Sequence, residues 1–389
     1  MKQTSLLKGI LLTSLLALFV AAVFALFHDE DRSKKPRRSL SVSETLSGDS
    51  KGFAQALVPR PFKFPDDHGA HPEFRNEWWY FTGNLKTPEG RHFGYQFTLF
   101  RTSLSNQTIS SPSQWASRQI YMGHLAVTDS QAKKYFHFER FSRAAIDLAG
   151  ARAHPFHVWL ENWFVSSRGN SFFPLTIQAS EGDLSLLLNL TSEKQKVLQG
   201  IQGLSKKGHQ PGNASYYYSF TRLKSEGQLF LDGIKYELEG LSWMDREWSS
   251  SVLEAQQSGW DWFAVQLSNG WELMYYQLRL KNGKTDSTSS GVLVSPKGQS
   301  FRLEHHQVAL KILDTWTSSS TGIRYPSQWE LKVPDRQISL TLTPRLAEQE
   351  FESSFTYWEG AVQVQGLFQN KAVRGEAYVE LTGYTKADP

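Results

Sequence analysis

Apolar and polar residues alternate with a period of two along most of the chain after Phe74. The clearest example is a pair of aromatic-rich segments, residues 77–85 and 92–100, separated by a turn sequence at residues 87–90. Successive side chains of a strand point to opposite faces, and two alternating segments joined by a short turn are typical of a β-hairpin. The pattern therefore predicts that these two segments are paired antiparallel strands.

The same alternation recurs in two series of short segments separated by turn signals. The first series comprises residues 121–129, 135–141, 157–163, 175–179, 184–190, 215–223, 228–231 and 234–241. The second comprises residues 260–267, 272–280, 290–294, 300–303, 307–315, 328–333, 338–344, 357–365, 372–374 and 377–382. No segment keeps a helical period for more than about three turns. We therefore predict an all-β protein with two consecutive antiparallel β-domains, residues 58–245 and 246–387.

The first 57 residues follow a different pattern. Lys2 and Lys8 precede an uncharged run over residues 9–27, and three acidic residues follow at 29–31. This layout predicts that residues 1–27 are an export signal or an N-terminal membrane anchor, which places the body in the periplasm or outside the cell. Residues 28–57 have no apolar period and are expected to form a flexible tether. Any contact with the membrane is expected only through the N-terminal segment.

Composition narrows the chemistry. The 389 residues include no cysteine, which excludes disulfides, thiolate metal sites and a cysteine nucleophile. The formal net charge is only +4, and the absence of a basic stripe argues against a nucleic-acid partner. The adjacent His305 and His306 would point to opposite faces of a strand, and the spacing of His154 and His157 requires a helix. We therefore predict no metal site and no cofactor.

Aromatic and ionisable residues are concentrated where the two predicted domains meet. Tryptophan is seldom placed in water, and carboxylates and arginine are seldom buried unless they are paired, so their interleaving predicts the wall of a pocket. An earlier stretch around residues 76–83 has the same character. The expected ligand contacts are Trp78, Trp79, Trp243, Arg246, Trp248, Trp260 and Trp262.

Several ordered blocks resemble a known family. They are His71-Pro72-Glu73-Phe74, Asn76-Glu77-Trp78-Trp79-Tyr80-Phe81-Thr82-Gly83, Gly123-His124-Leu125, Trp243-Met244-Asp245-Arg246-Glu247-Trp248, Gly259-Trp260-Asp261-Trp262-Phe263 and Tyr357-Trp358-Glu359-Gly360. They are similar to the proteins related to carotenoid 1,2-hydratase (hydroxyneurosporene synthase), many of which are predicted secreted hydrolases. The resemblance implies two lipocalin-like antiparallel β-barrels packed against each other. It also implies a hydrophobic ligand such as an isoprenoid or an acyl lipid.

The chain departs from the hydratase pattern at two chemical positions. The resemblance places the hydratase tryptophan at Trp248 and its tyrosine at Tyr275. The histidine position is occupied by Arg246, and the position of the proton-donating aspartate is occupied by Gln277. Carotenoid hydration therefore cannot be transferred directly from the family.

The carboxylates of the cluster still suit acid–base chemistry. Adding water to an alkene needs a strong acid in a dry pocket and aromatic faces beside the cation that forms. Asp245, Glu247 and Asp261 are the candidate acids or bases, with Tyr275 beside them. Along a strand Asp245 and Glu247 share one face while Arg246 takes the other, which separates the guanidinium from the acids. The alternative is a structural network in which arginine and carboxylates join the two barrels.

A structural interpretation also applies to the earlier block. Trp78 and Trp79 point to opposite sides of their strand, so only one of them can reach a ligand. Glu77 is expected to pair with an arginine such as Arg101 or Arg143.

Three functions are consistent with these patterns. The first is a hydratase or hydrolase acting on a hydrophobic molecule. The second is a non-catalytic periplasmic lipid carrier or an accessory protein of an envelope transporter, marked by an aromatic pocket without a desolvated carboxylate. The third is a glycan-binding β-protein, because tryptophan together with aspartate and glutamate also suits sugars.

Overall fold

A computed structural model describes residues 50–107, 111, 113–250 and 253–386. The predicted export segment 1–27 and most of the predicted tether 28–57 lie outside these residues. The described residues form strands, with three short 3₁₀ turns at Asp66–His68 (η2), His305–Gln307 (η3) and Pro334–Arg336 (η4). In this part of the chain, no helix has the length and apolarity needed to cross a membrane. The all-β prediction is confirmed.

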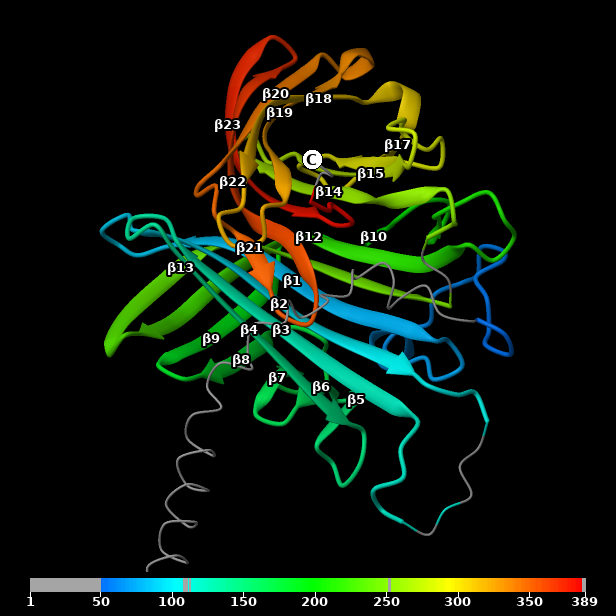
Figure 1. Ribbon diagram of the computed structural model, residues 1–389. Coiled ribbons are helices and arrows are strands. Elements are labelled where there is room, and N and C mark those ends of the chain that lie inside the picture. Colours follow the sequence, from blue (N-terminus) through cyan, green and yellow to red (C-terminus); the bar gives the residue numbers. More distant parts are fainter. Residues whose placement is uncertain (1–49, 108–110, 112, 251–252, 387–389) are drawn as a thin grey trace, which may run out of the picture. The chain divides into compact units, whose positions relative to one another are not determined.

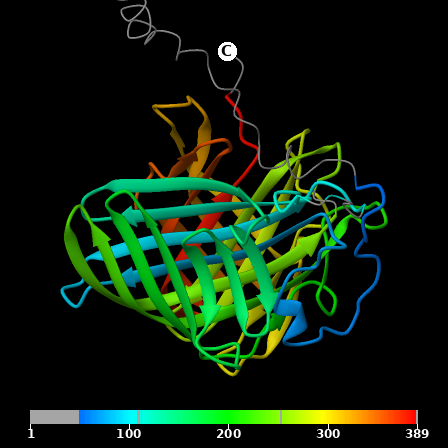
Figure 2. The same ribbon diagram turned by 90° about the horizontal axis from the view of Figure 1, so that it is seen from below.

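Thirteen strands form the first antiparallel sheet (Figure 1). They are β1 Asn76–Lys86, β2 His92–Ser103, β3 Gln119–Asp129, β4 Lys134–Arg143, β5 Ala149–Ala153, β6 Phe156–Leu160, β7 Trp163–Ser167, β8 Leu175–Glu181, β9 Leu184–Ser192, β10 Val197–Leu198, β11 Leu204–Lys206, β12 Ala214–Leu231 and β13 Ile234–Ser249. Their order is β4-β3-β2-β1-β13-β12-β9-β8-β7-β6-β5, and β10 and β11 pair with β12. Figure 2 shows the sheet curling into a barrel-like half, with the green strands crossing the blue and cyan ones.

Ten strands form the second sheet. They are β14 Gln257–Leu267, β15 Glu272–Leu280, β16 Ser290–Val294, β17 Ser300–Glu304, β18 Ala309–Thr317, β19 Arg324–Val333, β20 Ile338–Pro344, β21 Glu350–Glu352, β22 Thr356–Phe368 and β23 Lys371–Leu381. Their order is β17-β16-β15-β14-β23-β22-β20-β19-β18, and β21 pairs with β22. This sheet curls into a second barrel-like half, so the predicted pair of consecutive β-barrels is confirmed.

Pairing along the sheets follows the sequence pattern at the first hairpin and departs from it at the domain boundary. The hairpin predicted over residues 77–85 and 92–100 is formed by β1 and β2, with Glu77 opposite Arg101. The expected boundary between Asp245 and Arg246 falls inside β13, which stays paired with β1 as far as Ser249. The first sheet therefore continues four residues further than expected, because the backbone hydrogen bonds of β13 continue across that point.

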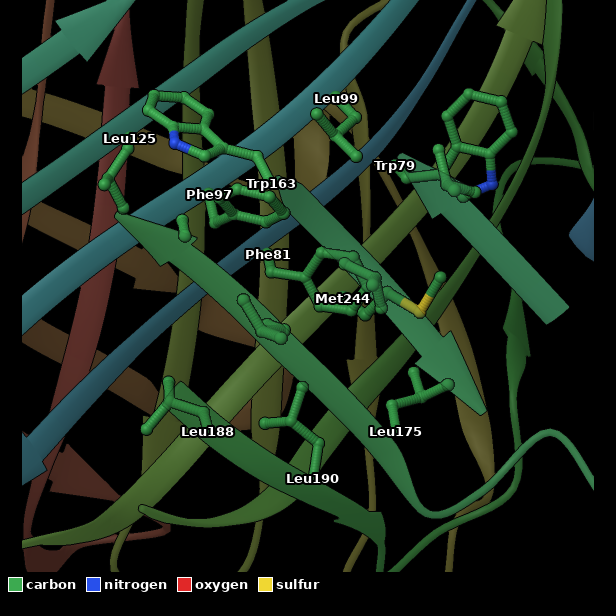
Figure 3. Close-up of a cluster of buried hydrophobic side chains, with 14 of the residues drawn as sticks. Trp79, Phe81, Phe97, Leu99, Leu125, Trp163, Leu175, Leu188, Leu190 and Met244 are labelled. Carbon is green, nitrogen blue, oxygen red and sulfur yellow. The ribbon is translucent and has the colours of Figure 1, made fainter. Parts of the chain in front are cut away.

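Each barrel-like half is filled by its own side chains. In the first half, Trp79, Phe81 and Phe97 lie in one buried cluster with Trp163 and Met244 (Figure 3). In the second half, an equivalent cluster surrounds Trp329 and Trp358. Large apolar residues therefore pack the interior of each half.

The two sheets contact each other through their outer faces. Gly94 on β2 meets Ala361 on β22 so closely that a Cβ atom at Gly94 would lie 2.5 Å from the Ala361 methyl carbon. Lys194 Nζ lies 2.7 Å from Glu272 Oε2, and Arg222 Nε lies 2.5 Å from Glu272 Oε1. This buried ion cluster joins the first sheet to β15. The close packing creates a junction in which outward-facing side chains of both sheets become buried.

Candidate active site

A cavity opens in this junction, between the outer faces of the two sheets. It encloses about 850 Å³ of empty space, including its opening to solvent, but only about 90 Å³ can hold the centre of a water molecule. The cavity is therefore a narrow slot. Its walls comprise Trp78, Tyr80, Gln96, Phe100, His124, Lys207, Tyr217, Asp245, Glu247, Leu253, Trp260, Trp262, Tyr276, Leu278, Tyr357, Glu359 and Glu380.

Asp245 is held at the cavity wall by three donors from the first sheet. Its carboxylate accepts hydrogen bonds from the Tyr217 hydroxyl at 2.5 Å, the Ser219 hydroxyl at 2.5 Å and the Trp243 indole N–H at 2.7 Å. Burial raises the pKa of Asp245 to about 7, although these three donors oppose the rise. Asp245 is therefore a carboxyl group poised between its two protonation states at neutral pH.

Glu247 lies two residues further along β13 on the same face. Its Oε1 atom is 2.9 Å from Lys207 Nζ and also accepts a hydrogen bond from the Ser215 hydroxyl. The Lys207 ammonium lies 4.3 Å from the centre of the Tyr276 ring. Burial lowers the pKa of Lys207, but Glu247, Tyr276 and Asp245 together outweigh burial and raise it. The result is a buried ion pair at one wall of the cavity.

Two further carboxyl groups come from the second sheet. Glu359 on β22 and Glu380 on β23 are directly opposite each other in the strand register; Glu359 is buried and Glu380 is half-buried. Glu359 accepts a hydrogen bond of 2.5 Å from Tyr80, and Glu380 accepts one of 3.0 Å from the Trp260 indole. Burial raises the pKa of Glu380 to about 8, and burial together with the Glu380 charge raises the pKa of Glu359 well above its usual range.

These facing glutamates behave as a neutral acid. Two carboxylates that share a dry site cannot both ionise without a large electrostatic cost, so at least one keeps its proton at neutral pH. Aromatic rings lie close by. The ring of Trp262 is edge-to-face with those of Tyr80 and Trp243, at 5.2 Å and 6.3 Å between ring centres. The cavity thus combines a buried acid with aromatic faces.

The structure gathers only part of the predicted site around the cavity. Asp245, Glu247, Trp78, Trp260 and Trp262 line it. Trp243 lies behind Asp245 in the apolar cluster of the junction.

Four other predicted residues face the interior of the barrel-like halves. Trp79 and Trp248 belong to the core of the first half, and Tyr275 belongs to the core of the second. Asp261 pairs with Arg279 and accepts a hydrogen bond of 3.1 Å from Tyr384. Gln277, at the expected position of the hydratase acid, is opposite Asp261 in the register and is also absent from the cavity wall.

Arg246 lies in the core of the first half, away from the cavity. It is fully buried on the inner face of β13, pairs with Glu77 and lies 4.0 Å from the Trp79 ring centre. Glu77 also pairs with Arg101, as the sequence predicts. The separation of Arg246 from Asp245 and Glu247 by strand alternation is confirmed.

Sequence reasoning missed Glu359, Glu380, Lys207 and the pair formed by His124 and Tyr357. Glu359 and Glu380 stand out in hindsight as acids inside apolar strands. Their facing register, however, depends on a strand pairing that alternation alone does not define. Tyr276 replaces Tyr275 at the cavity because the strand phase is one residue away from the expected one.

A second, larger groove lies elsewhere between the sheets. It holds about 1450 Å³ of empty space and is lined by polar residues such as Arg345, Arg374 and Glu376. It has no aromatic wall apart from His92 and lacks a facing pair of acids. The slot around Glu359 and Glu380 is therefore the stronger candidate for chemistry.

Fold and site together define a protein with two lipocalin-like barrels and a cavity at their junction. A family model described as AttH-like matches residues 55–384. The chain belongs to the AttH-like family. An AttH candidate from Nitrosomonas europaea is 33% identical, and the alignment covers 86% of this chain and 100% of that one with a TM-score of 0.76.

Two more distant structures share the fold. Kievitone hydratase from Nectria haematococca is 14% identical over 86% of this chain and 97% of its own, with a TM-score of 0.65. CghA in complex with Sch210972 is 13% identical over 88% of this chain and 99% of its own, with a TM-score of 0.53. Comparison with curated protein sequences gave no match. The predicted resemblance to hydratase-like proteins with two lipocalin-like barrels is confirmed at the level of family and fold.

Proposed function

We propose that this protein is an acid–base enzyme of the hydratase type, which adds water to a carbon–carbon double bond of a small hydrophobic molecule. The observation that supports the proposal best is the facing pair Glu359 and Glu380, which lines an aromatic cavity. Such a pair keeps a proton at neutral pH and can donate it without help from a metal or cofactor.

The proposed reaction has two steps. The protonated member of the Glu359–Glu380 pair donates its proton to one alkene carbon, which leaves a cation on the other carbon beside the faces of Trp260 and Trp262. A water molecule then bonds to that cation and loses a proton to Glu247, which Lys207 holds in place. The product carries one new C–H bond and one new C–OH bond. The pair regains its proton from solvent, and Glu247 releases one.

The narrow slot also bears on the substrate. A cavity with so little space for water excludes solvent from a reacting cation, and its aromatic walls favour flat or unsaturated molecules. An isoprenoid or an unsaturated acyl chain meets these requirements. A carrier without chemistry requires no desolvated acids, so the raised pKa values of Asp245 and Glu380 favour the enzyme over the carrier.

We further propose that the reaction takes place outside the cytoplasm. The support is the order of charges around residues 9–27, with lysines before the apolar run and acidic residues after it. An isoprenoid or acyl substrate would also be available in the envelope.

The test is to identify the bound molecule and follow its fate. Full-length protein is purified from envelope extract, its ligand is identified by mass spectrometry, and the ligand is incubated with the protein in water enriched in heavy oxygen. We expect heavy oxygen to enter the ligand with wild-type protein. Because a general acid typically contributes roughly 10²–10⁴-fold, Glu380→Gln should slow this incorporation by about that factor.

Glu376→Gln is the matched control, since Glu376 lies on the same strand outside the cavity. Ligand that is retained without oxygen incorporation would support the carrier instead. A co-purifying sugar would support the glycan-binding alternative.

A further inference from the structure

A line of polar side chains, joined by hydrogen bonds over its outer steps, runs from the surface of the first sheet to the acid pair. Glu139 on β4 begins it, with its Oε1 atom 3.2 Å from His124 Nε2. His124 Nδ1 is 2.7 Å from the Tyr357 hydroxyl. Glu359 lies two residues further along β22, on the same face as Tyr357, and Tyr357 is one of the neighbours that lower its pKa. Four side chains thus connect the protein surface with the cavity.

The middle of this line is rigid and dry. His124 is fully buried, stacks on Phe351 with 4.4 Å between ring centres and has Phe100 at its edge. Both ring nitrogens therefore have a fixed partner. Burial lowers the pKa of His124, so the ring is neutral and carries one proton that can sit on either nitrogen.

Glu139, at the outer end of the line, reaches solvent, and two hydrogen bonds fix the orientation of its carboxylate. The Glu139 side chain is 11% exposed, unlike the other three members. Its carboxylate accepts hydrogen bonds from the Ser353 hydroxyl at 2.8 Å and the Ser354 amide at 3.2 Å. These two donors come from the turn between β21 and β22 of the second half, so the line forms only where the two halves meet.

We propose that Glu139, His124 and Tyr357 form a proton relay that recharges the Glu359–Glu380 pair from solvent. The proposal rests on the proposed function, because it assigns how the acid of that reaction regains its proton. Glu139 lies outside the cavity wall and acts through His124 and Tyr357, which line it, so Glu139 is a positioning and relay residue.

One relay step conserves both protons and charge. Before the step, Glu359 is ionised, His124 carries its proton on Nδ1, and Glu139 has taken a proton from solvent. The Glu139 O–H bond breaks as Nε2–H forms, the Nδ1–H bond breaks as a new Tyr357 O–H forms, and the old Tyr357 O–H breaks as Glu359 O–H forms. Glu359 is then neutral, Glu139 is ionised, and the other two groups are neutral as before.

The experiment measures proton exchange directly and needs no substrate. Infrared spectroscopy of the full chain detects the C=O band of a protonated carboxyl, and loss of the band in Glu359→Gln or Glu380→Gln assigns it to the pair. Protein is then mixed rapidly with heavy water, and the isotope shift of the band is followed in time. We expect a fast phase in wild type that is lost in His124→Phe and in Glu139→Gln.

Thr128→Val is the matched control. Thr128 lies on the same strand as His124 and donates a 2.7 Å hydrogen bond to Gln349 across the same junction, but it is not part of the relay. It should leave the fast phase unchanged. If His124→Phe does not fold, Glu139→Gln and Tyr357→Phe test the outer and inner steps separately.

The outcomes separate the relay from the function on which it rests. A carboxyl band that persists with an unchanged fast phase in His124→Phe and Glu139→Gln would overturn the relay, because protons would then enter through the cavity mouth. Absence of the carboxyl band in wild-type protein at neutral pH would overturn the proposed acid itself.

Discussion

Glu359 and Glu380 illustrate how single residues are perturbed by the junction. Like charges directly opposite each other on neighbouring strands destabilise a sheet, and burial adds a desolvation cost to each charge. The fold tolerates the pair because a proton replaces one charge, and because Tyr80 and Trp260 satisfy the oxygen atoms. The same features that cost stability keep a proton on the pair at neutral pH.

A pH dependence of stability follows from Glu380. Its pKa is about 8 in the folded protein and 4.5 ordinarily, so between these values the folded state holds a proton that the unfolded state has released. The contribution of Glu380 to the free energy of unfolding is therefore fully present below about pH 4.5. It falls as pH rises towards 8, by about 1.4 kcal/mol per pH unit for one proton. Urea unfolding of Glu380→Gln over this range should show a shallower fall than wild type.

Glu237→Gln serves as the control for that experiment, because Glu237 is 58% exposed and lies on β13 away from the cavity. Its unfolding curve should keep the wild-type dependence on pH. Equal slopes for Glu380→Gln and wild type would mean that Glu380 is ionised throughout the range.

Strand β13 shows how one element serves two environments. Its alternate residues Asp245 and Glu247 face the cavity, whereas Arg246 faces the core of the first half. Neighbouring residues in the sequence therefore have different tasks, since a strand presents successive side chains to opposite sides.

Substitutions along β13 should separate stability from chemistry. Arg246→Met removes one partner of the buried Glu77 carboxylate, which should cost about 3–5 kcal/mol because a buried charge loses part of its compensation. Asp245→Asn keeps one acceptor oxygen, which suffices for Ser219 and Trp243, and leaves no buried charge without its partner, so it should cost less. Urea denaturation measures both. A larger loss for Asp245→Asn would assign the structural role to the cavity face.

The sequence shows which residues of a strand share a face, because apolar and polar residues alternate. It does not show which distant strands pair. The opposite orientations of Trp78 and Trp79, and of Asp245 and Arg246, follow from a period of two. The expectation that Tyr275 faces the site differs from the structure, in which Tyr276 lines the cavity and Tyr275 lies in the core. Both residues are aromatic, so composition does not define the strand phase.

The acid pair and the relay depend on contacts between remote segments. His124 and Tyr357 are 233 residues apart, and they meet only because the outer faces of two sheets pack together. No local propensity encodes that contact. The sequence indicated a site at the junction, but the identity of its acids required the strand register.

At the scale of the whole molecule, the buried cluster around Glu272 couples the two halves. Glu272 is fully buried and is held by Lys194 and Arg222 from the first sheet. Removal of its charge leaves two cations in the junction without their carboxylate, which is a costly arrangement.

Glu272→Gln should therefore loosen the junction more than either barrel-like half. Scanning calorimetry is expected to show two unfolding transitions where wild type shows one, because each half keeps its own core. Glu330→Gln is the control, since Glu330 pairs with Lys332 within the second sheet alone. A single transition at a uniformly lower temperature would indicate that the halves cannot fold independently.

Because the cavity lies between the two barrel-like halves, the equilibrium of ligand binding is coupled to the docking of the halves. A molecule that fills the slot contacts both halves at once, so it binds only while they are docked. By mass action, such a ligand at about one hundred times its Kd stabilises the docked form by about 2.7 kcal/mol. The affinity of the two halves for each other and their affinity for the ligand are thus reciprocal quantities, and a substitution such as Glu272→Gln should weaken ligand binding without touching the cavity wall.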